Sequence, residues 1–174
     1  MNIPNTLTVI RIIMVPVFGY FVYEKQYIIA VVIFTLAGLT DVLDGLIARR
    51  CNMVTSWGKL ADPAADKLMQ ITALIILNIQ GKIPLILVIT AILKDLIISI
   101  GSYLLYRQNK MIAQANWYGK LTTVILYFSI VLVLFNGPFS EIFIIISLFS
   151  VLFSFVMYAV KFIKIKAGKN NVEG

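Results

Sequence analysis

The sequence predicts an all-α integral membrane protein, and three observations support this fold class. Of the 174 residues, 60% are hydrophobic, and the mean hydropathy of +0.95 is far above that of a soluble domain. Six apolar segments follow one another, each close to the ~20 residues that span the hydrocarbon core. Most of the connections between them are short, which favours antiparallel neighbours. We therefore expect a single membrane domain over residues 1–174, built as a bundle of six transmembrane helices.

The first apolar segment, 6–23, follows a polar stretch in which Asn5 or Thr6 can cap the helix and Pro4 precedes the first turn. Arg11 interrupts this segment, either as an interfacial residue that reaches the lipid headgroups or as a contact to a substrate. The N-terminus lacks the basic region and the small-residue cleavage site of a removable signal peptide, so we expect it to be retained.

The remaining segments are expected at 27–48, 57–79, 83–106, 117–135 and 140–163. The fourth differs from the others because it has a polar stripe at helical spacing, which should face the interior of the bundle. This stripe consists of Asp95, Ser99, Ser102 and Tyr106, with Lys94 beside it. The sixth segment leads into a basic tail over about 164–174.

The net charge of +7 reflects 15 basic and 8 acidic residues. The basic residues fall between the apolar runs and at the C-terminus, a pattern that indicates membrane topology and not nucleic-acid binding. One side of the predicted membrane has only Lys25 and Lys82 in its connections. The other side has Arg49, Arg50, Lys59, Arg107, Lys110, Lys120 and the basic tail. We therefore expect both termini in the cytoplasm of a cell with a bacterial-type cytoplasmic membrane.

Half of the acidic residues lie within residues 41–66. They are Asp41, Asp44, Asp62 and Asp66. Spacings of three and four residues place each pair on one face of a helix, so the four carboxylates converge if the two helices form a hairpin. The orientation above puts this cluster, and with it the expected active site, at the cytoplasmic side.

Four converging carboxylates repel one another unless cations neutralise them. Oxygen ligands favour hard divalent ions such as Mg²⁺, Mn²⁺ or Ca²⁺. The absence of His and the single Cys51 make a zinc or copper site improbable. Gly45, Ala48 and Gly58 are small enough for a ligand to approach closely, and Arg49 is suited to phosphate oxygens.

Residues 41–66 fit, at every position, the signature D-x2-D-G-x2-A-R-x8-G-x3-D-x3-D. On these residues the chain resembles the CDP-alcohol phosphotransferases, integral membrane enzymes of phospholipid synthesis. The resemblance implies two divalent metals, Mg²⁺ or Mn²⁺, held by the four aspartates. It also implies that Asp66 is the catalytic base and that CDP-diacylglycerol is the donor. The residues implied to bind this CDP-lipid are Asn5, Thr6, Gly45, Ala48, Arg49, Thr55 and Gly58.

The acceptor implied by the resemblance is glycerol 3-phosphate. The N-terminal entry and the Gly119-Lys120-x-x-Thr123 string are similar to the branch of the family that uses it. Lys120, Arg107 and Lys94 are the implied acceptor-binding residues. Phosphatidylglycerol, used by CDP-alcohol-type cardiolipin synthases, and an inositol phosphate are alternative acceptors. The family also implies membrane lipids as partners and a homodimer.

A hypothesis of a different class is an ion transporter or channel, because carboxylates inside membrane helices also mark ion pathways. Transport needs polar groups at depth on several helices. Here the acidic residues gather at one predicted level together with an arginine and glycines, so the sequence favours an enzyme.

Overall fold

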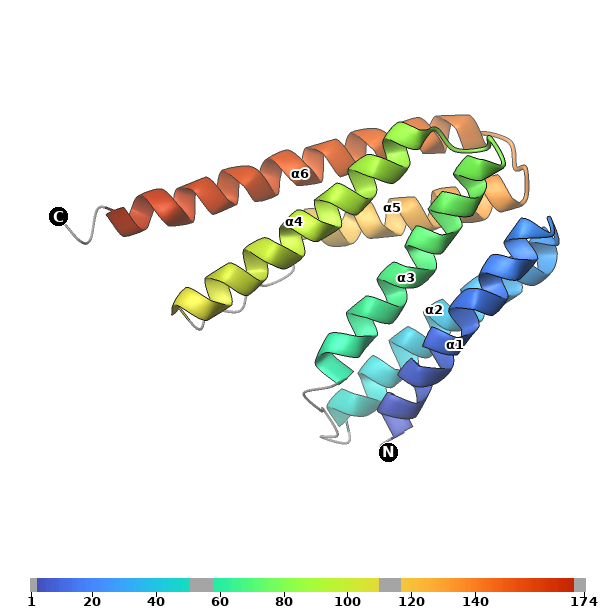
Figure 1. The fold of residues 1–174 in the computed structure, drawn as a ribbon, viewed down its shortest axis with the longest axis horizontal. Coiled ribbons are helices and arrows are strands. Elements are labelled where there is room, and N and C mark those ends of the chain that lie inside the picture. The colour runs from blue at the N-terminus through green and yellow to red at the C-terminus, as the bar shows by residue number, and fades with distance from the viewer. Residues whose placement is uncertain (1–2, 51–57, 110–116, 171–174) are drawn as a thin grey trace. The chain divides into compact units, whose positions relative to one another are not determined.

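The computed structural model describes residues 3–50, 58–109 and 117–170, with side chains described over 6–40, 64–100 and 117–160. In this part of the chain all regular secondary structure is α-helical (Figure 1). The helices are α1 (Ile3–Tyr23), α2 (Tyr27–Arg50), α3 (Gly58–Ile79), α4 (Leu85–Asn109), α5 (Trp117–Leu134) and α6 (Ser140–Asn170). The six predicted segments are confirmed as helices.

The helix ends show two differences from the predictions. Helix α1 begins at Ile3, so Asn5 and Thr6 lie in its first turn and are not caps. Proline is compatible with the first turn, where its missing N–H has no partner to lose. Helix α6 continues to Asn170 through the stretch expected to be a tail, because Lys and Ala favour helices.

The apolar helices identify a membrane protein. Three described stretches are long and apolar enough to cross a membrane, namely Thr6–Tyr23, Trp117–Leu134 and Ser140–Val160. A shorter apolar helical stretch covers Tyr27–Thr40. Many large apolar side chains on these helices are exposed, as expected where lipid takes the place of water.

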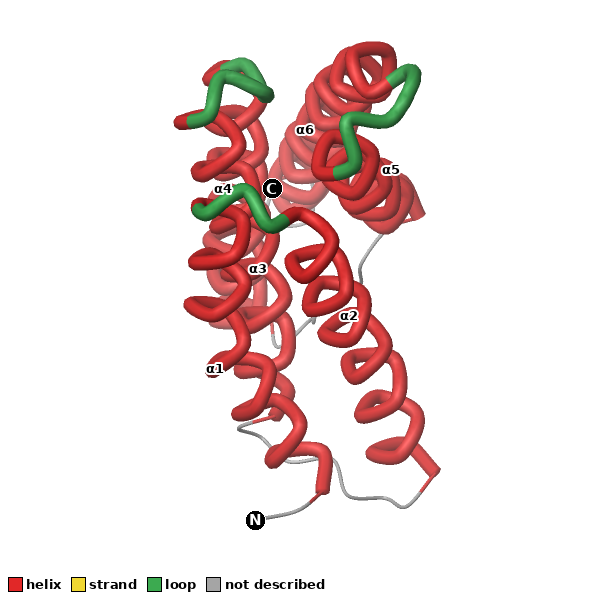
Figure 2. Tube along the Cα trace, turned by 90° about the vertical axis from the view of Figure 1, so that its right-hand side faces the viewer, coloured by secondary structure: helices red, strands yellow, loops and turns green. Residues whose placement is uncertain are grey.

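The chain forms two compact units, and the first comprises residues 1–83 and 130–138. In this unit α1 packs against both α2 and α3, whereas α2 and α3 contact each other little. Helices α1 and α3 run in the same direction and α2 runs in the opposite one (Figures 1 and 2). The rings of Phe18 and Phe34 stack with centroids 5.3 Å apart, which joins α1 to α2.

A close contact between α1 and α3 depends on a glycine. A Cβ atom added at Gly19 would lie 3.0 Å from Cγ2 of Thr72 and 3.4 Å from Cδ1 of Ile76. Small residues allow helix backbones to approach in this way in membrane proteins. The contact also fixes which residues of α1 and α3 lie side by side.

Three helices have their C-terminal ends in the first unit, and these ends have the same form. The residues after α1, α3 and α5 that take a positive φ are Lys25 (60°), Gly81 (72°) and Asn136 (47°). In each case the next residue donates its backbone N–H to a carbonyl five residues earlier, as Lys82 does to Leu77 at 2.9 Å. This is the Schellman cap, which satisfies helix carbonyls that otherwise have no partner.

Side chains tie these turns together. Tyr27 donates its hydroxyl to Oε1 of Gln80 at 3.0 Å, and Nε2 of Gln80 donates to the Val22 carbonyl at 2.7 Å. Lys82 Nζ donates to Oδ1 of Asn136 at 2.7 Å and lies 3.8 Å from the centroid of the Tyr27 ring. The turns that end α1 and α3 are therefore fastened to each other.

The second unit comprises residues 84–129 and 139–174. Its helices α5 and α6 are joined by buried hydroxyls: Ser129 donates to the Phe143 carbonyl at 2.8 Å and lies 2.6 Å from Oγ of Ser147. The rings of Phe128 and Phe143 meet edge to face at 5.0 Å. Helix α6 also packs on α4.

We predict that Gly19→Leu destabilises the first unit, because the added side chain must displace Thr72 or separate α1 from α3. Overpacking of this kind costs about 1–3 kcal/mol. The measurement is the thermal unfolding midpoint of the purified protein in detergent. Gly38→Ala is the matched control, because a Cβ at Gly38 meets no atom within 4 Å and alanine favours helices. Equal midpoints for Gly19→Leu and Gly38→Ala would contradict the packing.

Candidate active site

The signature aspartates lie on the two helices predicted for them. Residues 41 and 44 belong to α2, and residues 62 and 66 belong to α3. Each pair therefore shares one helical face. Asp66 is the one whose side chain is described, and it is half-buried.

Other sequence-predicted residues can be placed by element. Helix α2 also contains Gly45, Ala48 and Arg49, and α3 begins at Gly58. Their side chains, like those of Asp41, Asp44, Asp62 and Asn5, lie outside the described side chains, and Thr55 lies outside the described residues altogether. Thr6 is exposed on the first turn of α1. Among the side chains that the structure does describe, no three His, Cys, Asp or Glu residues form a cluster that could hold a metal.

The packing of α1 shows which of these positions lie at the same level along the helix axes. Gly19 lies beside Thr72 and Ile76, and Arg11 is eight residues, or about 12 Å, closer to the N-terminus. Helix α3 runs parallel to α1, so eight residues back from Thr72 and Ile76 lead to residues 64 and 68. The midpoint of these two positions is Asp66. Phe18 stacks on Phe34, and seven residues along each of these antiparallel helices lead to Arg11 and to residue 41. The three positions 11, 41 and 66 therefore share one level of the unit.

Arg11 is buried at this level. Its side chain is 1% exposed, and Thr8, one turn nearer the N-terminus, is 0% exposed. An arginine that reached the lipid headgroups would be exposed, so the interfacial interpretation of Arg11 is wrong. A buried guanidinium is stable only beside opposite charge. The acidic residues of 1–83 are Glu24, which is exposed at the far end of α1, and the four aspartates of the signature.

Gln70 is a further buried polar residue on α3. It lies four residues after Asp66 and is 1% exposed, and its Oε1 atom has no hydrogen-bond donor in the described part of the chain. Sequence reasoning missed it because one amide in an apolar run changes the hydropathy little. Its spacing from Asp62 and Asp66, eight and four residues, is the signal that could have found it.

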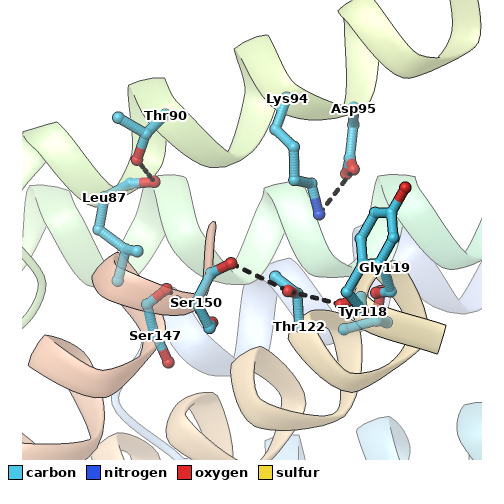
Figure 3. Close-up of polar contacts among 10 residues, drawn as sticks. Leu87, Thr90, Lys94, Asp95, Tyr118, Gly119, Thr122, Ser147 and Ser150 are labelled. Carbon is cyan, nitrogen blue, oxygen red and sulfur yellow. Dashed lines mark hydrogen bonds and ion pairs between the residues drawn. The ribbon is translucent and has the colours of Figure 1, made fainter. Parts of the chain in front are cut away.

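The second unit contains a buried ion pair. Lys94 Nζ lies 3.0 Å from Oδ1 of Asp95, and the two side chains are 2% and 14% exposed. Figure 3 shows Lys94 extending from α4 toward the start of α5, near Tyr118 and Thr122. Of the polar stripe predicted on α4, Asp95 is mostly buried, as expected, whereas Ser99 is exposed. The side chains of Ser102 and Tyr106 lie outside the described side chains.

The Gly119-Lys120-x-x-Thr123 string has a packing role. A Cβ at Gly119 would lie 2.5 Å from the hydroxyl of Tyr158 on α6, so only glycine allows this contact. Thr122 Oγ1 lies 3.1 Å from the Ser150 carbonyl, also on α6 (Figure 3). Lys120 itself is exposed. The side chain of Arg107, on α4, lies outside the described side chains. Lys94 and Lys120, the other two predicted acceptor residues, therefore differ in their surroundings, since the first is buried and the second is exposed.

The chain belongs to the CDP-alcohol phosphatidyltransferase family, whose model matches residues 1–157. The resemblance predicted from residues 41–66 is thus confirmed. Helices rich in apolar residues and a signature of this family together define a membrane-bound phosphatidyltransferase.

Individual relatives cover different shares of the chain. The CDP-diacylglycerol–glycerol-3-phosphate 3-phosphatidyltransferase of Aquifex aeolicus is 33% identical over 171 residues, which are 92% of this chain and 96% of the relative. A probable phosphatidylglycerophosphate synthase of Mycobacterium tuberculosis is 34% identical over 130 residues, 71% of this chain and 61% of the relative. The CMP-forming cardiolipin synthase of Homo sapiens is 40% identical over 108 residues, 61% of this chain and 36% of the relative.

We predict that Arg11→Met destabilises the protein strongly, because it leaves carboxylates at the same level without their counter-charge. Removal of one partner of a buried pair costs about 3–5 kcal/mol. Thermal unfolding of the purified protein measures the loss. Lys25→Met, which removes an exposed charge from the turn after α1, should change the midpoint little. Equal changes in the unfolding midpoint for the two substitutions would show that the Arg11 guanidinium does not neutralise buried carboxylates.

Proposed function

We propose that the protein transfers the phosphatidyl group of CDP-diacylglycerol to glycerol 3-phosphate, giving phosphatidylglycerophosphate and CMP. The observation that carries this proposal is the similarity to the Aquifex aeolicus enzyme, which extends over nearly the full length of both chains. The uninterrupted signature in residues 41–66 supports it, because no residue that the chemistry needs is missing.

The reaction is a displacement at phosphorus. The acceptor hydroxyl oxygen forms a bond to the β-phosphorus of CDP-diacylglycerol, the bond from that phosphorus to the bridging oxygen breaks, and CMP leaves. Asp66 takes the proton of the attacking hydroxyl. A base in this position typically contributes 10²–10⁴-fold to the rate.

Asp41, Asp44, Asp62 and Asp66 would hold two divalent metal ions, Mg²⁺ or Mn²⁺. Four carboxylates on neighbouring helices fit hard cations, and one buried guanidinium, that of Arg11, cannot balance them all. When bound, such ions neutralise phosphate charge. The rest of the CDP-lipid would be bound by Asn5, Thr6, Gly45, Ala48, Arg49, Thr55 and Gly58.

Cationic side chains beyond the signature would bind the acceptor phosphate. Lys120 is the first candidate because it is exposed at the start of α5, with Arg107 next. Lys94 is the weakest of the three because it is buried and paired with Asp95. The positive-inside pattern supports a single six-span membrane domain with both termini and the site in the cytoplasm, and the family supports a homodimer.

A second candidate reaction uses phosphatidylglycerol as acceptor and gives cardiolipin. The similarity to CMP-forming cardiolipin synthases favours it as the alternative. The donor, the signature and the role of Asp66 are the same in both reactions. The two candidates differ in whether the acceptor comes from the aqueous phase or from the bilayer.

We predict that purified protein releases CMP from CDP-diacylglycerol with glycerol 3-phosphate and Mg²⁺ or Mn²⁺, and that excess EDTA abolishes this release reversibly. CMP release and product mass are measured with glycerol 3-phosphate, phosphatidylglycerol and inositol phosphate in parallel. Product with phosphatidylglycerol alone would favour cardiolipin synthesis. Full turnover in EDTA would refute the metal site.

We predict that Asp66→Asn lowers kcat by roughly 10²–10⁴-fold, because the amide keeps the shape of the side chain but cannot take a proton. Binding of CDP-diacylglycerol should change much less. Glu141→Gln is the matched control, since it converts an exposed carboxylate in the first turn of α6 to the same amide. An Asp66→Asn rate within a few-fold of the wild type would assign the base to another group.

A further inference from the structure

Gln70 has a polar atom that the proposed reaction does not yet use. Its Oε1 atom is buried without a hydrogen-bond donor in the described part of the chain, and the side chain is 1% exposed. The buried neighbours on α3 are apolar, and each is at most 1% exposed: Met69, Ala73 and Leu74. A buried carbonyl oxygen without a donor is unfavourable for folding. A ligand that supplies a donor would remove this cost.

The position of Gln70 points to the acceptor end of the site. Gln70 follows Asp66 by one helical turn on the same face of α3. Side chains in an α-helix lean toward its N-terminus, so the Gln70 side chain covers the turn that contains Asp66. One ligand can therefore contact the Asp66 carboxylate and the Gln70 oxygen together.

Helix α2 has a small residue, Gly38, close to the level of Gln70. Residue 41 of α2 shares the level of Asp66, so residues 37 and 38, four and three positions earlier on this antiparallel helix, share the level of Gln70. Gly38 is half-buried, and a Cβ added there would meet no atom within 4 Å. Helices α2 and α3 also have few direct contacts.

The chemistry of the substrates identifies the donor that Gln70 needs. Near the β-phosphorus, CDP-diacylglycerol offers phosphate oxygens and ester carbonyls, which are all hydrogen-bond acceptors. Its donors, the ribose hydroxyls and the cytosine amine, lie beyond the pyrophosphate. A glycerol group, in contrast, carries a second hydroxyl directly beside the one that attacks phosphorus.

We infer that Gln70 is a specificity-determining residue whose Oε1 accepts a hydrogen bond from the secondary hydroxyl of a glycerol acceptor while Asp66 contacts the terminal hydroxyl. The inference rests on the proposed function and deepens it. Soluble glycerol 3-phosphate and the headgroup of phosphatidylglycerol both contain this diol, so the role of Gln70 is the same for either source.

The test compares acceptors with and without the secondary hydroxyl. The pairs are glycerol 3-phosphate with 3-hydroxypropyl phosphate, and phosphatidylglycerol with phosphatidyl-1,3-propanediol. The wild type should prefer the diol by about tenfold or more in kcat/KM, because a buried polar group left unpaired penalises the analogue. The pair that shows turnover identifies the source of the acceptor.

Gln70→Met preserves the size of the side chain and removes the oxygen. In this variant, kcat/KM for the diol should exceed kcat/KM for its analogue by no more than about threefold. The change should come mainly from slower transfer to the diol, with little change in KM for CDP-diacylglycerol. Gln70→Asn keeps the amide but shortens its reach, so its preference should be intermediate. Since Gln70→Asn keeps a polar group, it also serves if Gln70→Met folds poorly.

Gln80→Met is the matched control. It makes the same substitution beyond the opposite end of α3, where Gln80 bonds Tyr27 and the Val22 carbonyl. It should lower stability and leave the acceptor preference unchanged. A Gln70→Met enzyme that keeps the wild-type preference, or slows equally with both members of a pair, would overturn the inference while the proposed function stands. Transfer only to an acceptor without a glycerol group would overturn both.

Discussion

The structure of the first unit depends on the burial of one guanidinium among apolar helices. Arg11 is 1% exposed, and a charge in such surroundings is tolerated only beside opposite charge. Two contacts fix the position of α1 along its neighbours: Phe18 stacks on Phe34, and Gly19 packs against Thr72. They place Arg11 at the level of positions 41 and 66. Helix α1 therefore links the two helices that carry the signature, although it contributes none of its aspartates.

Much of the fold was predictable because the relevant signals are local. Apolar runs of membrane-spanning length predicted all six helices. The faces of the helices were harder to predict, because hydropathy does not tell whether a residue meets lipid or protein. Ser99 was expected inside and is exposed. Arg11 was expected either at the interface or in contact with a substrate, and its burial contradicts the first of these interpretations.

The candidate site likewise has a part that could be predicted from the sequence and a part that could not. The spacing of the aspartates within α2 and α3 follows from the sequence alone, and the family model confirms the resemblance predicted from it. The partners that surround it come from other helices at large sequence separation, and no local pattern reports them. Gly119 illustrates this difference: in the sequence it belongs to a motif linked with acceptor choice, and in the structure it makes room for Tyr158.

The shared level of positions 11, 41 and 66 also limits how the N-terminal helix can change length. One residue inserted between Arg11 and Gly19 would rotate everything before it by about 100° and turn Arg11 toward lipid. Four inserted residues would restore the face but shift Arg11 by about 6 Å along the axis. Insertions and deletions in this interval should therefore be tolerated far less than substitutions of its lipid-facing residues.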